Sequence, residues 1–203
     1  MGAVEPSRRE RTKDETRERI SIAAIQLFHE KGFDATTVDE IAARADVAKG
    51  TFFNYFPRKE AVLHAITERM MDELEALAEK LNSDPRSVKE KLLVVFDAAC
   101  GLYAVNPDLH RHAIVEMLRG PLASAVDIDA RAQTFVRDLV LKGQERGELR
   151  ADVDPDRMAY TLRSVFFMTV LVWVHCPWMF ELKPEMAARL QLAMQGLATG
   201  GAA

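Results

Sequence analysis

Prolines divide this chain into segments that are long enough to be helices. Apart from Pro6, they stand at positions 57, 85, 107, 121, 155, 177 and 184. Because proline lacks a backbone N–H and disfavours helical geometry in the residue before it, a helix tends to begin or end at each of these positions. The segments between them contain neither alternating runs of Val, Ile and Thr nor Asn-Gly or Asp-Gly hairpin turns. This pattern predicts an all-α protein.

The composition indicates a soluble globular protein. The 203 residues are 48% hydrophobic and 29% charged, which is enough apolar material for the core of one or two domains. The formal net charge of -4 excludes a polycation that binds nucleic acid through bulk charge, so DNA binding would require a local patch. Cys100 and Cys176 are the only cysteines, which excludes a multi-bridge disulfide framework and fits a reducing cytoplasm.

The sequence does not indicate targeting to a membrane or to secretion. Residues 1–20 lack the apolar stretch of a secretory signal. The most apolar stretch, residues 165–180, is shorter than the roughly 20 residues that span a bilayer, and Pro177 interrupts it. We therefore expect a cytoplasmic protein with no membrane partner, in which this stretch is a buried helix. Flexible ends are expected at residues 1–13 and 199–203.

Two helices are expected between residues 14 and 46. Apolar residues at helical spacing predict a first helix that starts near Asp14 and stops at Gly32. Thr37 and Glu40 have the spacing of a capping box, which predicts the start of a second helix of about two turns. Asp46 is expected to end it, since Asp tolerates the left-handed conformation.

A third short helix is expected over residues 48–55, because Pro57 disfavours helical geometry just before it. Phe52 and Phe56 are four residues apart, so they share one side of this helix and are expected to pack against the first two helices. The residues expected on the outward side are Lys49, Gly50, Phe53 and Asn54.

Residues 37–56 have the form of a helix-turn-helix motif, in which the second helix enters the major groove of DNA. Lys49 suits a phosphate or a guanine edge, Asn54 suits adenine, and Phe53 suits a thymine methyl group. Gly50 has no side chain, so the backbone can approach DNA closely. The spacing alone leaves a plain helical hairpin inside a bundle equally open.

The charge around this motif is locally positive, although residues 1–66 as a whole hold 11 Lys and Arg against 11 Asp and Glu. Within residues 44–59 the cations are Arg44, Lys49, Arg58 and Lys59, and the single acid is Asp46. The expected N-terminal arm adds Arg8, Arg9 and Arg11. These arginines either reach a neighbouring groove or form a solvated tail, which is the simpler interpretation.

The first 66 residues contain the runs LF…KGF, TTVDEIA, ADVAKGTFFNYF and RKEAVL. With these features, the chain over about residues 14–66 resembles the DNA-binding domain of the TetR family of bacterial transcriptional regulators. The resemblance implies that double-stranded DNA is contacted by Thr37, Lys49, Gly50, Thr51, Phe53, Asn54, Tyr55 and Lys59. Three residues depart from the family pattern: Ala48 replaces a capping Ser, Asp46 replaces the turn Gly, and Phe53 replaces Tyr.

The rest of the chain is expected to form long helices, and it resembles the family in layout alone. The expected helices cover residues 59–81, 87–105, 108–118, 122–146, 155–176 and 184–198. The resemblance implies that residues 67–198 form a ligand-binding and dimerisation domain. Apolar and adaptable side chains suit a hydrophobic small-molecule effector. The candidate pocket residues are Phe96, Cys100, Tyr103, Met117, Phe135, Phe167 and Trp173.

A homodimer is expected because the helix over residues 155–176 is apolar on almost every side. Such a helix has to be buried on more than one side, and a second copy of the chain would cover what one subunit leaves exposed. The candidate interface residues are Val165, Thr169, Val172, Cys176, Leu190 and Met194. The resulting hypothesis is a dimeric repressor that a small hydrophobic effector releases from a pseudo-palindromic operator.

Two other classes of function stay open at this point: an all-helical small-molecule carrier or interaction module that does not bind DNA, and a helical enzyme with an unrecognised site. The sequence contains no GxGxxG, GxSxG or HExxH motif and no phosphate-binding Gly-Lys-Ser/Thr loop, so neither a catalytic site nor a cofactor is expected. No metal site is expected either. His110 and His112 point to different sides of a helix, and His175 with Cys176 lacks a third ligand nearby.

Overall fold

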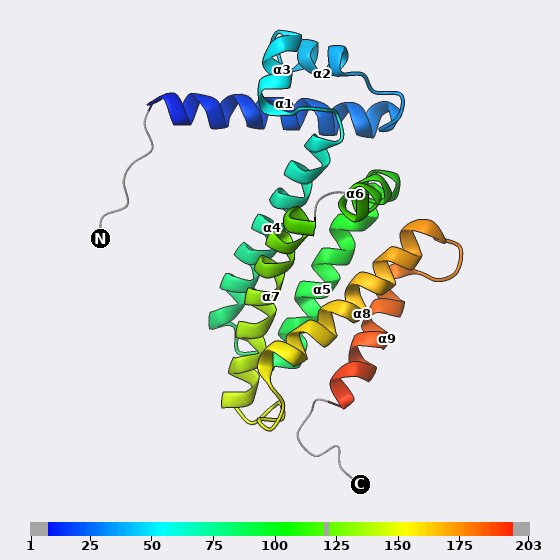
Figure 1. Cartoon of the computed structure of the whole chain (residues 1–203). Coiled ribbons are helices and arrows are strands. Elements are labelled where there is room, and N and C mark those ends of the chain that lie inside the picture. The colour runs from blue at the N-terminus through cyan, green and yellow to red at the C-terminus, as the bar shows by residue number, and fades with distance from the viewer. Residues whose placement is uncertain (1–7, 120–121, 197–203) are drawn as a thin grey trace. The chain divides into compact units, whose positions relative to one another are not determined.

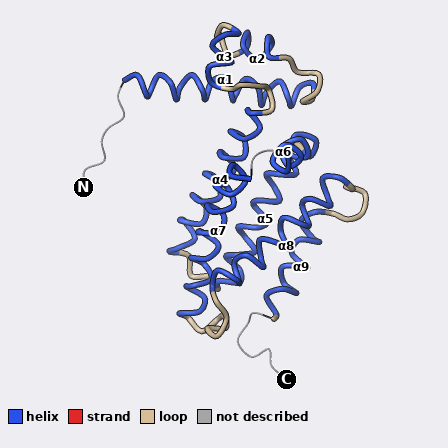
Figure 2. Tube along the Cα trace, viewed as in Figure 1, coloured by secondary structure: helices blue, strands red, loops and turns tan. Residues whose placement is uncertain are grey.

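The computed structural model describes residues 8–119 and 122–196, and within these ranges the chain consists of helices and loops (Figure 1). The α-helices are α1 Arg8–Lys31, α2 Val38–Arg44, α3 Lys49–Tyr55, α4 Ala61–Lys80, α5 Val88–Val105, α6 Pro107–Arg119, α7 Leu122–Glu145, α8 Pro155–His175 and α9 Leu182–Gln195. A 3-10 helix over Leu81–Ser83 follows α4. Neither described range contains a β-strand (Figure 2), and the all-α prediction is confirmed.

The first helix is longer than the sequence analysis predicts. Helix α1 already includes Arg8, whereas the expected start was Asp14. Arg8, Arg9 and Arg11 therefore belong to this helix, whereas the sequence analysis placed them before its start. Residues 8–19 are rich in Arg and Glu, which are strong helix formers even without apolar periodicity. The rest of the expected arm, residues 1–7, and the tail 199–203 lie outside the described residues.

The chain divides into two compact units, Met1–Ile66 and Thr67–Ala203, and the division falls within α4. In the first unit, α2 packs against α1 and α3. The most deeply buried side chains there include Ile20, Ala24, Phe28, Ile41, Phe52 and Phe56. Phe52 and Phe56 were predicted to pack inward, and this prediction is confirmed.

Two residues with left-handed backbone geometry define the turns of the first unit. Gly32 follows α1 with a φ of 86°, and Asp46 follows α2 with a φ of 53°. Both stops were predicted. Asp is one of the few residues besides glycine that tolerate this conformation, so the exchange of the family's turn glycine for Asp46 leaves the turn intact.

In the second unit, α5 is the central helix and packs against α6, α7, α8 and α9 (Figure 1). Ser87 and Glu90 form a capping box at the start of α5. At the start of α8 the side chain of Asp154 accepts a hydrogen bond from the Arg157 N–H at 3.0 Å, and Pro155 occupies the first turn, as the sequence predicts.

Helix α8 has 21 residues and is apolar enough, by length and composition alone, to cross a membrane. It packs instead against α6, α7 and α9, so it is a core helix of the second unit. Burial within the subunit is incomplete, because only 33% of its most apolar 18-residue window is buried.

Candidate nucleic-acid interface and apolar ligand site

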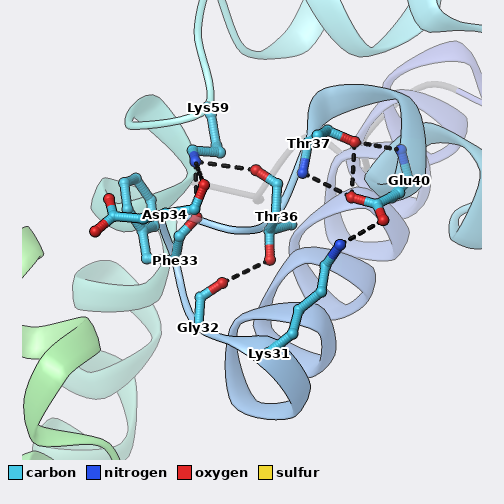
Figure 3. Close-up of polar contacts among 8 residues, drawn as sticks. All are labelled: Lys31, Gly32, Phe33, Asp34, Thr36, Thr37, Glu40 and Lys59. Carbon is cyan, nitrogen blue, oxygen red and sulfur yellow. Dashed lines mark hydrogen bonds and ion pairs between the residues drawn. The ribbon is translucent and has the colours of Figure 1, made fainter.

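The turn between α1 and α2 is built around the predicted capping box (Figure 3). The Thr37 hydroxyl accepts a hydrogen bond from the Glu40 N–H at 3.3 Å, and the Thr37 N–H donates to the Glu40 carboxylate at 2.8 Å. Lys31, in the last turn of α1, forms an ion pair with the same carboxylate. The Lys31 ammonium, assisted by Thr37, lowers the pKa of Glu40 to about 2. Glu40 is therefore ionised near neutral pH and links the end of α1 to the start of α2.

Helix α3 has a buried side and an exposed side, as predicted. Phe52 and Phe56 are 0% and 2% exposed, with their ring centroids 5.8 Å apart. The exposed residues are Lys49, Gly50, Phe53 and Asn54, and the half-buried ones are Thr51 and Tyr55. Ala48, which replaces the usual Ser, makes no side-chain capping hydrogen bond to α3.

Gly50 is not required by the fold of the first unit. A Cβ atom added to Gly50 would meet no heavy atom within 4 Å, and its backbone is helical. Glycine within a helix is destabilising by roughly 0.5–1 kcal/mol relative to alanine. A need for glycine at this position therefore has to come from something that approaches α3 from outside.

Two of the cations that were expected to form a positive patch are paired with acidic residues in the folded unit. Arg44 forms an ion pair with Glu30 of α1, and Lys49 forms one with Asp39 of α2 at 2.9 Å. Neither acid belongs to residues 44–59, so counting charges in that segment overstated the positive field. The Lys49–Asp39 pair is exposed on both sides, and such pairs contribute little and exchange partners readily.

Lys59 lies in the turn before α4, and its ammonium group is used inside the first unit (Figure 3). It donates hydrogen bonds to the carbonyls of Phe33 at 2.7 Å and Thr36 at 2.9 Å, with a longer one to Asp34 at 3.5 Å. The same ammonium lies 4.3 Å from the centroid of the Phe33 ring. The family resemblance implied that Lys59 contacts DNA, and nothing in the sequence places its ammonium beside residues 33–36.

In the second unit, apolar and aromatic side chains from α4, α5, α7 and α8 meet. Met71 and Leu74 of α4 pack with Ala99 of α5, and Phe135 of α7 and Phe166 of α8 pack against them. The Phe166 ring lies 5.5 Å from Phe96 and 5.9 Å from Tyr103, both of α5. We call these side chains the apolar cluster; its members are Met71, Leu74, Phe96, Ala99, Tyr103, Phe135 and Phe166.

The predicted pocket residues fall into two groups. Phe96, Tyr103 and Phe135 belong to the apolar cluster, and burial raises the pKa of Tyr103 to about 12. Cys100 is fully buried in the larger core that α5 to α9 form, which also includes Phe96, and burial raises the pKa of its thiol to about 12. Trp173 packs against the same core. The half-buried residues Met117 and Phe167 are not among those that the cluster brings together.

A groove of about 300 Å³ runs beside this cluster, between α4 and α7. Phe135, Ala78 and Leu139 line its apolar part. Arg131 of α7 closes one edge through hydrogen-bonded ion pairs with Glu75 at 2.7 Å and Asp72 at 2.6 Å. These carboxylates, Glu75 first, raise the pKa of Arg131 above its usual range. Ion pairs thus help to hold α4 against α7.

The structure contradicts three of the six predicted dimer-interface residues. Thr169, Leu190 and Met194 are between 0% and 3% exposed, so they belong to the interior of one subunit. Val165 packs against the same core, and Val172 and Cys176 are half-buried. The sequence pattern failed here because α8 is apolar on both sides, and periodicity alone cannot tell the core side from the outer side. The large apolar side chains exposed on α8 and α9 are Tyr160, Met168 and Leu192.

Comparison with known proteins decides the family. Residues 20–66 match the family described as "Bacterial regulatory proteins, tetR family". Residues 67–196 match "TetR/AcrR family transcriptional repressors, C-terminal domain". The chain belongs to the TetR family. It is therefore a DNA-binding transcriptional regulator of the repressor type, with an N-terminal helix-turn-helix domain and a C-terminal ligand-binding domain.

Individual TetR-family proteins match over most of the chain. A crystal structure of Thermus thermophilus FadR, a repressor in complex with lauroyl-CoA, is 31% identical, with a TM-score of 0.78 over 92% of this chain and 97% of that one. The fatty acid metabolism regulator protein of Bacillus subtilis is 24% identical, covering 86% of this chain and 92% of its own length. The regulator AcrR of Shigella flexneri is 27% identical over 84% of each chain.

Proposed function

We propose that this regulator binds a pseudo-palindromic operator as a homodimer, with one α3 helix in each of two major grooves. The outward side of α3 supports this, because it combines a cation, a glycine, an aromatic ring and an amide. The proposed DNA contacts are Thr37, Lys49, Gly50, Thr51, Phe53, Asn54 and Tyr55. Asn54 and Phe53 read bases, whereas Lys49 holds a phosphate. The protein acts in the cytoplasm by binding and not by catalysis.

The proposed dimer surface is the outer side of α8 together with α9. Tyr160 and Met168 lie two turns apart on one side of α8 and are 61% and 51% exposed, and Leu192 of α9 is 71% exposed. The two helices pack on each other, so these side chains belong to adjoining surfaces. Apolar side chains of this size, on a helix whose apolar window is only 33% buried, suit a two-fold interface of four helices.

Sedimentation at low protein concentration tests this surface. Met168→Glu should shift the equilibrium from dimer to monomer, because it places a charge in an apolar interface. Leu118→Glu is the matched control, since Leu118 of α6 is also exposed, at 61%. If the two variants dissociate to the same extent, or neither does, the interface lies elsewhere.

We propose that the effector is a long-chain acyl thioester held in the second unit. The observation that carries this is the 31% identity, over nearly the whole length of both chains, with a repressor that binds lauroyl-CoA. The apolar cluster supports it, because alkyl and aromatic side chains without charged groups suit an acyl chain. Bound among these helices, the acyl chain would favour a conformation in which the two α3 helices no longer match successive major grooves.

Calorimetric titration tests the effector class. Lauroyl-CoA should bind, and CoA without an acyl chain should bind far more weakly. Phe135→Ala should weaken binding of lauroyl-CoA, whereas Leu118→Ala should not. The bound form should release a DNA duplex that the protein itself has selected from a random-sequence pool. Equal binding of CoA and lauroyl-CoA, or no binding of either, would remove the acyl chain as the recognised group while leaving DNA binding untouched.

A further inference from the structure

We propose that Lys59 is a positioning residue for DNA recognition and not a phosphate contact. Its ammonium ties the turn between α1 and α2 from the other side of the first unit, and thereby holds α2 and α3 in the orientation that DNA binding needs. The claim that Lys59 holds the turn between α1 and α2 concerns the folded unit alone. The claim that this contact serves DNA recognition rests on the proposed operator binding.

The donors of Lys59 are already in use. A lysine ammonium has three N–H donors and no acceptor. Two of them reach the carbonyls of Phe33 and Thr36 at normal hydrogen-bond lengths of 2.7 and 2.9 Å, and the third approaches that of Asp34 at 3.5 Å. A DNA phosphate would have to displace one of the two short contacts or compete with the Asp34 carbonyl for the third donor. Hydrogen bonds to charged groups are among the stronger ones in proteins, so the two short contacts hold the ammonium in place.

The surroundings of the ammonium are those of an internal contact. Phe33 is 8% exposed and Thr36 is 1% exposed, while Lys59 itself is half-buried. The Phe33 ring lies beneath the ammonium, at 4.3 Å from its centroid to the Lys59 nitrogen. A cation over an aromatic face gains more when water is excluded from the contact. The carbonyls and the ring together make a socket for one cation.

This socket is connected to the start of α2 by the chain itself (Figure 3). Two hydrogen bonds hold Thr36 in place. Its hydroxyl donates to the Gly32 carbonyl at 2.8 Å, and its own carbonyl accepts from the Lys59 ammonium. The next residue, Thr37, is the N-cap of α2. Fixing Thr36 therefore fixes the first residue of α2, and α2 packs directly against α3.

Lys59→Met is the variant that separates the two roles. Methionine keeps an unbranched apolar chain beside Phe33 and removes the charge and all three donors. Lys49→Met is the matched control, because it removes the same charge from an exposed site in the same unit. The DNA probes are a duplex that the wild-type protein selects from a random pool and a shuffled duplex of the same length.

The first measurement needs no DNA. Amide hydrogen exchange in residues 33–45 should become about 10-fold to 100-fold faster in Lys59→Met, as expected for losing hydrogen bonds to a charged group. Exchange in α5 should stay the same, and Lys49→Met should leave both regions unchanged. Unaltered exchange in residues 33–45 would overturn the proposal, whatever the protein does with DNA.

The second measurement is the dependence of DNA affinity on salt concentration. In Lys59→Met, affinity for the selected duplex should fall about 10-fold or more, with an unchanged salt slope and a smaller loss on the shuffled duplex. Lys49→Met should instead lower the slope by about one unit on both duplexes. A slope lowered by Lys59→Met would make Lys59 a phosphate contact, and unchanged affinity would leave it a stabilising residue only. A wild-type protein that selects no duplex would refute operator binding. The hydrogen-exchange result would still decide whether Lys59 holds the turn between α1 and α2.

Discussion

Gly50→Ala should make the protein more stable and bind DNA less tightly. The added methyl group meets nothing within 4 Å, and the helical backbone at Gly50 suits alanine. Replacing glycine in a helix should then stabilise the fold by about 0.5–1 kcal/mol. For a protein of this size, that raises the melting temperature by about 1–4 °C. On DNA, the same methyl group lies where backbone and groove are proposed to approach most closely.

The loss of DNA affinity follows from crowding. A methyl group forced into a tight contact typically costs about 1–3 kcal/mol. That corresponds to a Kd about 5-fold to 150-fold higher. Thermal denaturation of the free protein and titration of a fluorescent duplex, selected by the wild-type protein, measure the two effects separately. Gly196→Ala, just after α9, is a control that changes a glycine in the second unit and should leave DNA affinity unchanged.

The opposite signs make this prediction specific. Weaker binding together with a lower melting temperature would mean that alanine damages α3, and the DNA effect would then be indirect. A higher melting temperature with unchanged affinity would show that the backbone at Gly50 does not approach DNA closely. Either result would refute the claim that Gly50 is dispensable for folding and is needed for close approach to DNA.

Two further predictions concern acids around the helix-turn-helix motif. Asp39→Asn should free Lys49 and raise affinity for a shuffled duplex by up to about 5-fold, with a steeper salt dependence, because an exposed ion pair contributes about 0.2–1 kcal/mol. Asp108→Asn in the second unit is the control. An equal rise in that variant would mean that the effect comes from the change in net charge and not from freeing Lys49. Glu40 has its pKa held at about 2 instead of 4.5, so its contribution to stability is complete above pH 4.5 and is lost as the pH falls from 4.5 towards 2. Chemical denaturation should therefore show Glu40→Gln less stable than wild type near neutral pH, with a difference that shrinks in acid; a difference independent of pH would contradict the ionised capping box.

Local sequence signals predicted the elements that depend on nearby residues. The capping box of Thr37 and Glu40, the left-handed stops at Gly32 and Asp46, and the start of α8 at Asp154 all involve groups within a few residues of each other. Such groups are placed by the local backbone, so spacing in the sequence is enough to identify them. The inward Phe52 and Phe56 and the outward face of α3 followed from helical periodicity in the same way.

Contacts between distant residues were decided by the tertiary structure alone. Glu30 neutralises Arg44 and the carbonyls of Phe33 and Thr36 engage Lys59, although 14 and more than 20 residues separate these partners. Periodicity also could not orient α8, because a helix that is apolar all round has no polar side to mark the solvent. Packing against α6, α7 and α9 made that choice, burying Thr169 and leaving Met168 exposed. The sequence alone therefore determined the helices and their caps, whereas folding determined which charges are paired and which apolar surface is left for a partner.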